Sequence, residues 1–97
     1  MTLDEIYTIK LISGDEMVAK ITAETDTAYT ITKPLTVVPG PQGIQMILSV
    51  FTADPERSYS LNKTACSIVA MTRTEVRDSY IEATTGIRPV SSKILMG

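Results

Sequence analysis

The chain has 97 residues, enough for one domain with its own core but with little material to spare. A hydrophobic content of 43% excludes a disordered chain, and the net charge of −2 differs from the basic balance of most nucleic-acid-binding domains. With no histidine and one cysteine, the sequence excludes histidine-based catalysis, an internal disulfide and a multi-cysteine zinc site.

The first third of the chain predicts a short, bent β-meander. Residues 6–12 alternate apolar and polar side chains, as in a half-buried strand, and Gly14 supplies the turn that follows. Residues 17–22 resume the pattern, in a stretch too short to decide whether its odd-numbered or even-numbered side chains face inward. Asp26 lies in a polar turn before a third predicted strand at 28–33.

The middle of the chain predicts further strands with less regular ends. Pro34 lacks a backbone donor, so the third strand either ends there or runs along a sheet edge, with residues 35–38 continuing it after a bend. A fourth strand is predicted at 44–52, with a further strand-like piece at 59–61, and a fifth strand at 65–71. The fourth and fifth strands are apolar on both faces, which is typical of a central strand or of an interface.

The hydrophobic period changes near the C-terminal end of the sequence. Thr72 and Glu75 have the spacing of a capping box, and apolar residues then recur at helical spacing. We therefore predict a helix over 73–85 that stops at Gly86, followed by a loose tail at 88–97.

Two short segments match the first Sm motif. Residues 9–14 (IKLISG) fit its apolar-x-Leu-x-Asn-Gly opening, with Ser13 where the motif has Asn, and residues 26–30 (DTAYT) lie where its acidic RNA-contact loop stands. Residues 61–64 (LNKT) carry a basic residue at the turn of the second motif but lack its Arg-Gly or Lys-Gly pair. On these segments the chain resembles the Sm-like proteins, in a diverged form similar to those of marine bacteriophages.

The resemblance implies a mainly β fold, a small five-stranded, bent antiparallel barrel of SH3 type with one α-helix. In the family the helix precedes the first strand, whereas here the helical pattern is C-terminal. We expect one Sm-like domain over residues 1–97, with the barrel at about 6–71, the helix at about 73–85 and the tail at 88–97.

The resemblance also implies a ligand, single-stranded RNA or single-stranded DNA. Asp26 and Thr30 fall in the first motif, where Thr30 replaces the usual Asn, and Asn62 and Lys63 fall in the second. Tyr59 follows an exposed charged turn, where its ring could stack on a base. Each residue also has a simpler interpretation, since an Asp between strands commonly caps its own turn and a polar hairpin turn needs no ligand.

The two strands that are apolar on both faces also predict self-association. Neither 44–52 nor 65–71 contains a Lys or Pro that would discourage pairing with another chain. In Sm-like rings such strands pair head to tail between subunits, and closure by rotation gives a homo-oligomeric ring. The alternative is that both strands are simply core.

The expected function is therefore that of an oligomeric ring that binds nucleic acid in RNA or DNA processing. The alternative is a protein–protein assembly or adaptor ring, such as a phage structural module, that binds no nucleic acid. No spacing pairs carboxylate, Lys or Tyr groups for acid–base work, so we expect no enzyme activity, no cofactor and no metal. The N-terminus lacks a signal-peptide pattern and the longest apolar stretch, 44–51, is too short to span a bilayer, which predicts a cytoplasmic protein (in the host cytoplasm if phage-encoded) without a membrane partner.

Overall fold

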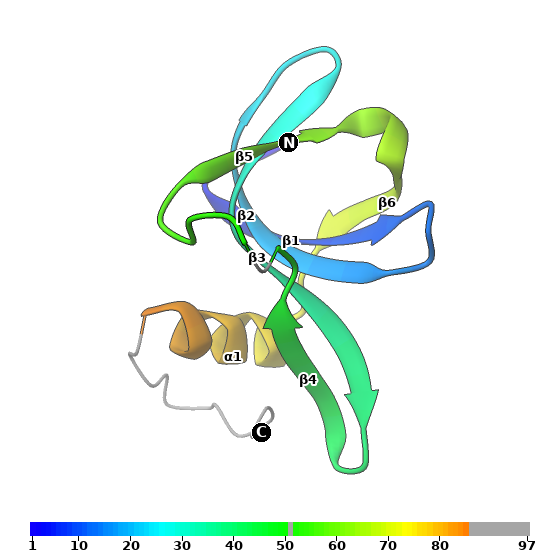
Figure 1. Cartoon of the computed structure of the whole chain (residues 1–97), viewed down its shortest axis with the longest axis vertical. Helices are drawn as coiled ribbons and strands as arrows, with labels where there is room; N and C mark the ends of the chain where they lie inside the picture. Colours follow the sequence, from blue (N-terminus) through cyan, green and yellow to red (C-terminus); the bar gives the residue numbers. More distant parts are fainter. Residues whose placement is uncertain (51, 86–97) are drawn as a thin grey trace.

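The computed structural model describes residues 1–50 and 52–85, and these form a mainly β structure with one α-helix (Figure 1). The elements are β1 (Glu5–Leu11), β2 (Glu16–Glu24), β3 (Ala28–Gly40), β4 (Gly43–Leu48), β5 (Ser58–Asn62), the short 3-10 helix η1 (Lys63–Ala65), β6 (Cys66–Met71) and α1 (Thr74–Thr85). The mainly β class and the C-terminal helix agree with the sequence prediction. The predicted stop at Gly86 and the tail at 88–97 lie outside the described residues.

All the strands belong to one antiparallel sheet with the order β4-β3-β2-β1-β6, and β5 also pairs with β3. Strand β3 can take two partners on one side because it is 13 residues long and bends in the middle. Residues 28–32 pair with β5 and residues 35–40 pair with β4. Lys33, at the bend, has a left-handed φ of 50°. The predicted continuation past Pro34 is therefore confirmed, and the alternative that the strand ends there is wrong.

The predicted strand count was wrong for the same reason. The fourth strand ends at Leu48 rather than residue 52, and the piece predicted at 59–61 is a separate strand, β5, on the other half of β3. Among residues 1–50 and 52–85 the sheet therefore has six strands rather than five. It curls without closing into a barrel, since no pairing joins β5 to β6 among the described residues. In Figure 1, β5, η1 and β6 curve around one side of the β1–β2 hairpin, whereas the β3–β4 hairpin extends away beside α1.

One side of the curled sheet encloses the first of two hydrophobic clusters. We call it the strand cluster, because strands alone build it; Ile9, Ala19 and Ile21 are fully buried in it. Side chains from β5 (Tyr59, Leu61) and from β6 cover it, although these strands lie at opposite margins of the sheet. Its buried members are Tyr7, Ile9, Met17, Ala19, Ile21 and Ile31.

The opposite side of the same strands packs against α1. We call this second group the helix cluster, with the buried members Ile6, Val18, Leu35, Val76 and Tyr80. Strand β2 contributes to both clusters, because its odd-numbered side chains enter the strand cluster and Val18 enters the helix cluster. Both faces of residues 17–22 therefore carry buried side chains.

Candidate nucleic-acid interface and open sheet edges

The structure brings three of the five predicted site residues to one end of the sheet. Asn62 pairs with Ala28 at the end of the β3–β5 ladder, and the backbone N–H of Lys63 donates to the Thr27 carbonyl oxygen at 2.8 Å. Asp26 lies in the same β2–β3 turn as Thr27. We call residues 24–27 together with Asn62 and Lys63 the turn cluster.

The β2–β3 turn is held by a threonine. The Thr25 hydroxyl accepts hydrogen bonds from the backbone N–H groups of Thr27 (3.3 Å) and Ala28 (3.1 Å), as Ser and Thr do in local turns. The Thr25 N–H and hydroxyl also donate to the Ala28 carbonyl oxygen. Asp26 is exposed at the tip of the turn, and the hydrogen bonds described above that hold the turn are those of Thr25.

Lys63 is the cation of the turn cluster, and it already has an anionic partner. Its Nζ lies 2.6 Å from Glu24 Oε2 and 5.1 Å from the centroid of the Tyr29 ring. The hydrogen bond between the two groups raises the pKa of the Lys63 ammonium and lowers the pKa of the Glu24 carboxyl. A phosphate that contacts Lys63 must therefore compete with Glu24.

Glu24 was missed by the sequence reasoning. It lies 39 residues from Lys63 and only the pairing of β2, β3 and β5 brings the two together. The one signal in the sequence is an acidic residue at the end of the second predicted strand, which is equally typical of a solvated turn.

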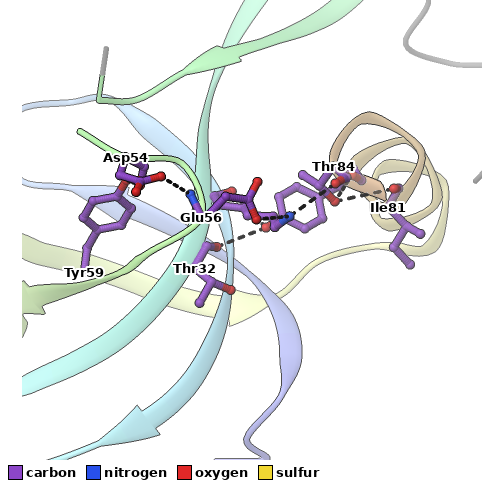
Figure 2. Close-up of polar contacts among 8 residues, drawn as sticks. Thr32, Asp54, Glu56, Tyr59, Ile81 and Thr84 are labelled. Atoms are coloured by element: carbon purple, nitrogen blue, oxygen red, sulfur yellow. Dashed lines mark hydrogen bonds and ion pairs between the residues drawn. The ribbon is translucent and has the colours of Figure 1, made fainter. Parts of the chain in front are cut away.

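The other two predicted residues lie further along the β3–β5 ladder. Thr30 pairs with Ser60, two residues from Asn62 and on the same face of the sheet. Tyr59 pairs with Ile31, lies on the opposite face and packs against the strand cluster. Its hydroxyl donates to the Asp54 carbonyl oxygen (Figure 2). Thr30 therefore shares a face with Asn62, whereas Tyr59 lies on the face of Tyr29, over whose ring the Lys63 ammonium is placed.

Strands β4 and β6 are both at edges of the sheet. Within the described residues β4 pairs with β3 alone and β6 pairs with β1 alone, so a row of backbone donors and acceptors on each is free for another strand. Both strands also expose large apolar side chains: Ile47 (44%) and Leu48 (48%) on β4, and Ile68 (59%) and Met71 (58%) on β6. The interpretation of 65–71 as a central strand was wrong, as was the alternative that both strands are simply core.

An open groove of about 720 Å³ runs between the β3–β4 hairpin, the start of α1 and the β6 edge. Its apolar lining includes Val37, Ile44, Ala70 and Met71, and its charged lining includes both signs. The groove extends the face that α1 covers elsewhere, so an apolar surface leads directly to the free margin of β6.

The described residues contain no group of three or more His, Cys, Asp or Glu side chains that could hold a metal ion. Cys66 is half-buried, packs against the strand cluster and points its Sγ at the Asn62 carbonyl oxygen at 3.6 Å. Burial raises the pKa of its thiol, which disfavours the reactive thiolate.

Comparison with known proteins adds no family to this description. No protein-family model matches the chain, and no curated protein matches its sequence. Of the part of the chain that is described, no helix is long and apolar enough to cross a bilayer.

Proposed function

We propose that this chain is a subunit of a homo-oligomeric, Sm-like ring that binds single-stranded nucleic acid, with RNA as the first candidate. The observation that carries the proposal is the pair of unpaired, apolar strand edges, β4 and β6, on opposite margins of one curled sheet. Two different edges on one subunit permit a head-to-tail contact, which closes into a ring when the rotation between subunits allows it.

The shape of the sheet supports the Sm-like part of the proposal. Strand β3 is strongly bent and shared by β4 and β5, and η1 carries the chain from β5 to the other margin at β6. Side chains from both margins meet on the strand cluster, as expected for a sheet on the way to a small barrel. A neighbouring subunit's strand would supply part of the pairing that one copy lacks.

The turn cluster supports the nucleic-acid part. The two turns that the Sm motifs single out are in contact through the bond from Lys63 N–H to the Thr27 carbonyl oxygen. In a ring, every subunit would present Asn62 and Lys63 at an equivalent position, and such repetition compensates for weak individual contacts.

A second candidate function is a protein assembly or adaptor ring that binds no nucleic acid. The observation that favours it is the Glu24–Lys63 ion pair, which neutralises the cation that a phosphate would need. Both candidates require the same strand edges and differ only at the turn cluster.

Self-association is tested by placing a charge on each edge. Ile68→Lys and Ile47→Lys put a solvated ammonium in the strand-pairing surface, and we expect each to convert the assembly to smaller species in light scattering. Leu3→Lys is the matched control, because Leu3 is 43% exposed but precedes β1, and we expect it to keep the mass of the wild type. A wild-type protein that stays monomeric at high micromolar concentration contradicts the ring.

Nucleic-acid binding is tested at low salt with fluorescein-labelled oligouridine and oligothymidine, because phosphate contacts are strongest there. Lys63→Ala and Asn62→Ala should weaken binding, and Lys63→Ala should lower the slope of log K against log salt by about 0.7 for each phosphate that the lysine neutralises. Glu24→Gln should strengthen binding, because it frees the ammonium, whereas the control Glu56→Gln should change it less. If the wild type binds neither oligonucleotide, the second candidate is favoured.

A further inference from the structure

The bend of β3 is held by the C-terminal helix. The Tyr80 hydroxyl on α1 lies 2.9 Å from the Lys33 carbonyl oxygen and 3.2 Å from the Thr32 carbonyl oxygen, so one donor is shared by two acceptors at the bend. Figure 2 shows these contacts between Thr32 in the strand and the last turns of the helix. Tyr80 is only 3% exposed, so the bond is shielded from water.

Lys33 is attached to the helix a second time, through its side chain. Its Nζ lies 3.4 Å from the Thr84 carbonyl oxygen, in the last turn of α1, where the helix dipole favours a cation. It also lies 4.0 Å from Glu56 Oε1, in the segment that joins β4 to β5 (Figure 2). Lys33, Tyr80 and Thr84 together are called the bend clamp below.

The backbone at the bend is unfavourable for its residue type. A left-handed φ is strained for a residue other than glycine, and such a residue persists where the surrounding structure over-determines it. Tyr80 and Thr84 supply the surrounding structure here. The Tyr80 hydroxyl donates to the Lys33 carbonyl oxygen, and the Lys33 ammonium donates to the Thr84 carbonyl oxygen.

The direction of one open edge depends on this bend. Beyond Pro34, the second half of β3 pairs with β4 and, as far as Val37, also with β2, and the end of the β3–β4 hairpin extends past the rest of the sheet (Figure 1). Val37, Ile44 and Met46 of this hairpin pack against the helix cluster, so the helix both fixes the bend and supports the hairpin. A change of angle at Lys33 would shift the free edge of β4 together with the stretch of β2 that pairs with residues 35–37 of β3.

We infer that Tyr80 and Lys33 are positioning residues for self-association, holding β4 at the angle at which its edge meets β6 of the next copy. The inference rests on the proposed ring. A head-to-tail contact closes only for particular rotations between subunits, and each subunit repeats the same angular error. The bend clamp therefore determines whether the assembly closes and with how many subunits.

The test compares two tyrosines that each lose one hydroxyl. Tyr80→Phe removes the donor at the bend. Tyr7→Phe is the control, because Tyr7 is 6% exposed and donates to the Thr2 carbonyl oxygen at 2.8 Å, in the strand cluster and away from the bend. Lys33→Asn tests the other contact, since Asn tolerates the left-handed conformation but has no ammonium.

The first readout is amide hydrogen exchange, which does not require assembly. At a dilution where any assembly has dissociated, Tyr80→Phe should speed exchange of the β4 amides about fivefold relative to those of the β1–β2 hairpin, as expected for one net hydrogen bond. Tyr7→Phe should not raise that ratio, because the hydroxyl that it removes belongs to β1, within the reference hairpin. Lys33→Asn should raise it less than Tyr80→Phe does, because its ammonium contacts are longer and more exposed.

The second readout is the mass distribution by native mass spectrometry. Tyr80→Phe should give smaller or mixed assemblies, whereas Tyr7→Phe should keep the distribution of the wild type. If the wild type assembles and the two variants match in both exchange and mass, the positioning role is overturned while the ring stands. If the wild type is monomeric the ring fails, and with it the role in assembly, whatever the exchange ratio says about the bend.

Discussion

The strand cluster and the helix cluster share β1, β2 and β3 but are covered in different ways. The sheet covers the strand cluster by curling, so that β5 and β6 fold over it from opposite margins. The helix cluster is covered by α1 and by the projecting β3–β4 hairpin. A small sheet that is apolar on both faces therefore needs two covers, and here only one of them is made by the sheet alone.

The two clusters also differ in how completely they exclude water. Three of the six buried members of the strand cluster, Ile9, Ala19 and Ile21, are 0% exposed, whereas the buried members of the helix cluster range from 1% at Val18 to 8% at Leu35. We therefore expect the strand cluster to dominate the free energy of unfolding, and the helix cluster to control the position of the hairpin.

The largest expected difference is in the loss of stability caused by truncating a buried side chain to alanine in each cluster. Ile9→Ala should lower the free energy of unfolding by about 3–4 kcal/mol, because it opens a cavity in a fully enclosed site. Val76→Ala should cost about 2 kcal/mol, because fewer atoms are removed and the helix can settle onto the sheet. Urea unfolding at matched protein concentration measures both costs. Equal costs would mean that the two covers are equally tight.

The next effect is the pH dependence of stability that Tyr80 gives to the helix cluster. Burial raises the pKa of Tyr80 to about 12 from its ordinary value of 10.0. The folded protein therefore holds this proton more tightly than the unfolded chain, so the stabilisation is complete below pH 10 and is lost as the pH rises towards 12. Between pH 8 and pH 12 the wild type should lose about 2 kcal/mol more than Tyr80→Phe, since one pKa unit corresponds to about 1.4 kcal/mol. Thermal unfolding of the pair across this range is the measurement, and parallel curves would show that Tyr80 ionises freely.

The smallest expected effect is at the turn of the β3–β4 hairpin, which packs against the helix cluster and not against the strand cluster. Gly43 has a φ of 120°, so Gly43→Ala should lower stability by about 1 kcal/mol through the backbone alone, although nothing crowds the added methyl group. Gly40→Ala is the matched control, since its methyl group would meet the Gln45 side chain at an ordinary 3.5 Å and stability should change by less than about 0.5 kcal/mol. A similar loss for both would assign the effect to packing at the tip.

The sequence predicted the elements that follow from local pattern. Alternation located β1 and β2, Gly14 marked their turn with a φ of 101°, and helical spacing located α1 to within one residue. The helix begins at Thr74, and the Thr72 hydroxyl pairs with the Thr8 hydroxyl at 2.8 Å, a contact between sheet and linker that no local pattern contains.

What the sequence did not predict depends on the bend of β3. Because one strand serves two partners, the predicted pieces 44–52 and 59–61 become separate strands on the two halves of β3, and no local pattern reveals that pairing. Asp26, Asn62 and Lys63 were singled out from motif positions, and the structure places these three residues at one end of the sheet. The partner of Lys63, Glu24, depends on the alignment of three strands and could not be read from spacing.

The long return of β6 to β1 has a consequence for how the protein forms during synthesis. Strand β1 pairs with β2 across a short turn, but its other side pairs with Cys66–Met71, which is synthesised much later. The Thr8–Thr72 hydroxyl pair likewise joins residues 64 apart in the sequence. Until that segment leaves the ribosome, the nascent hairpin carries a bare strand margin beside half-covered aliphatic side chains. Ribosome-bound chains truncated before residue 66 should therefore engage chaperones that recognise unpaired strands more strongly than chains released after α1, in which β6 covers the margin of β1.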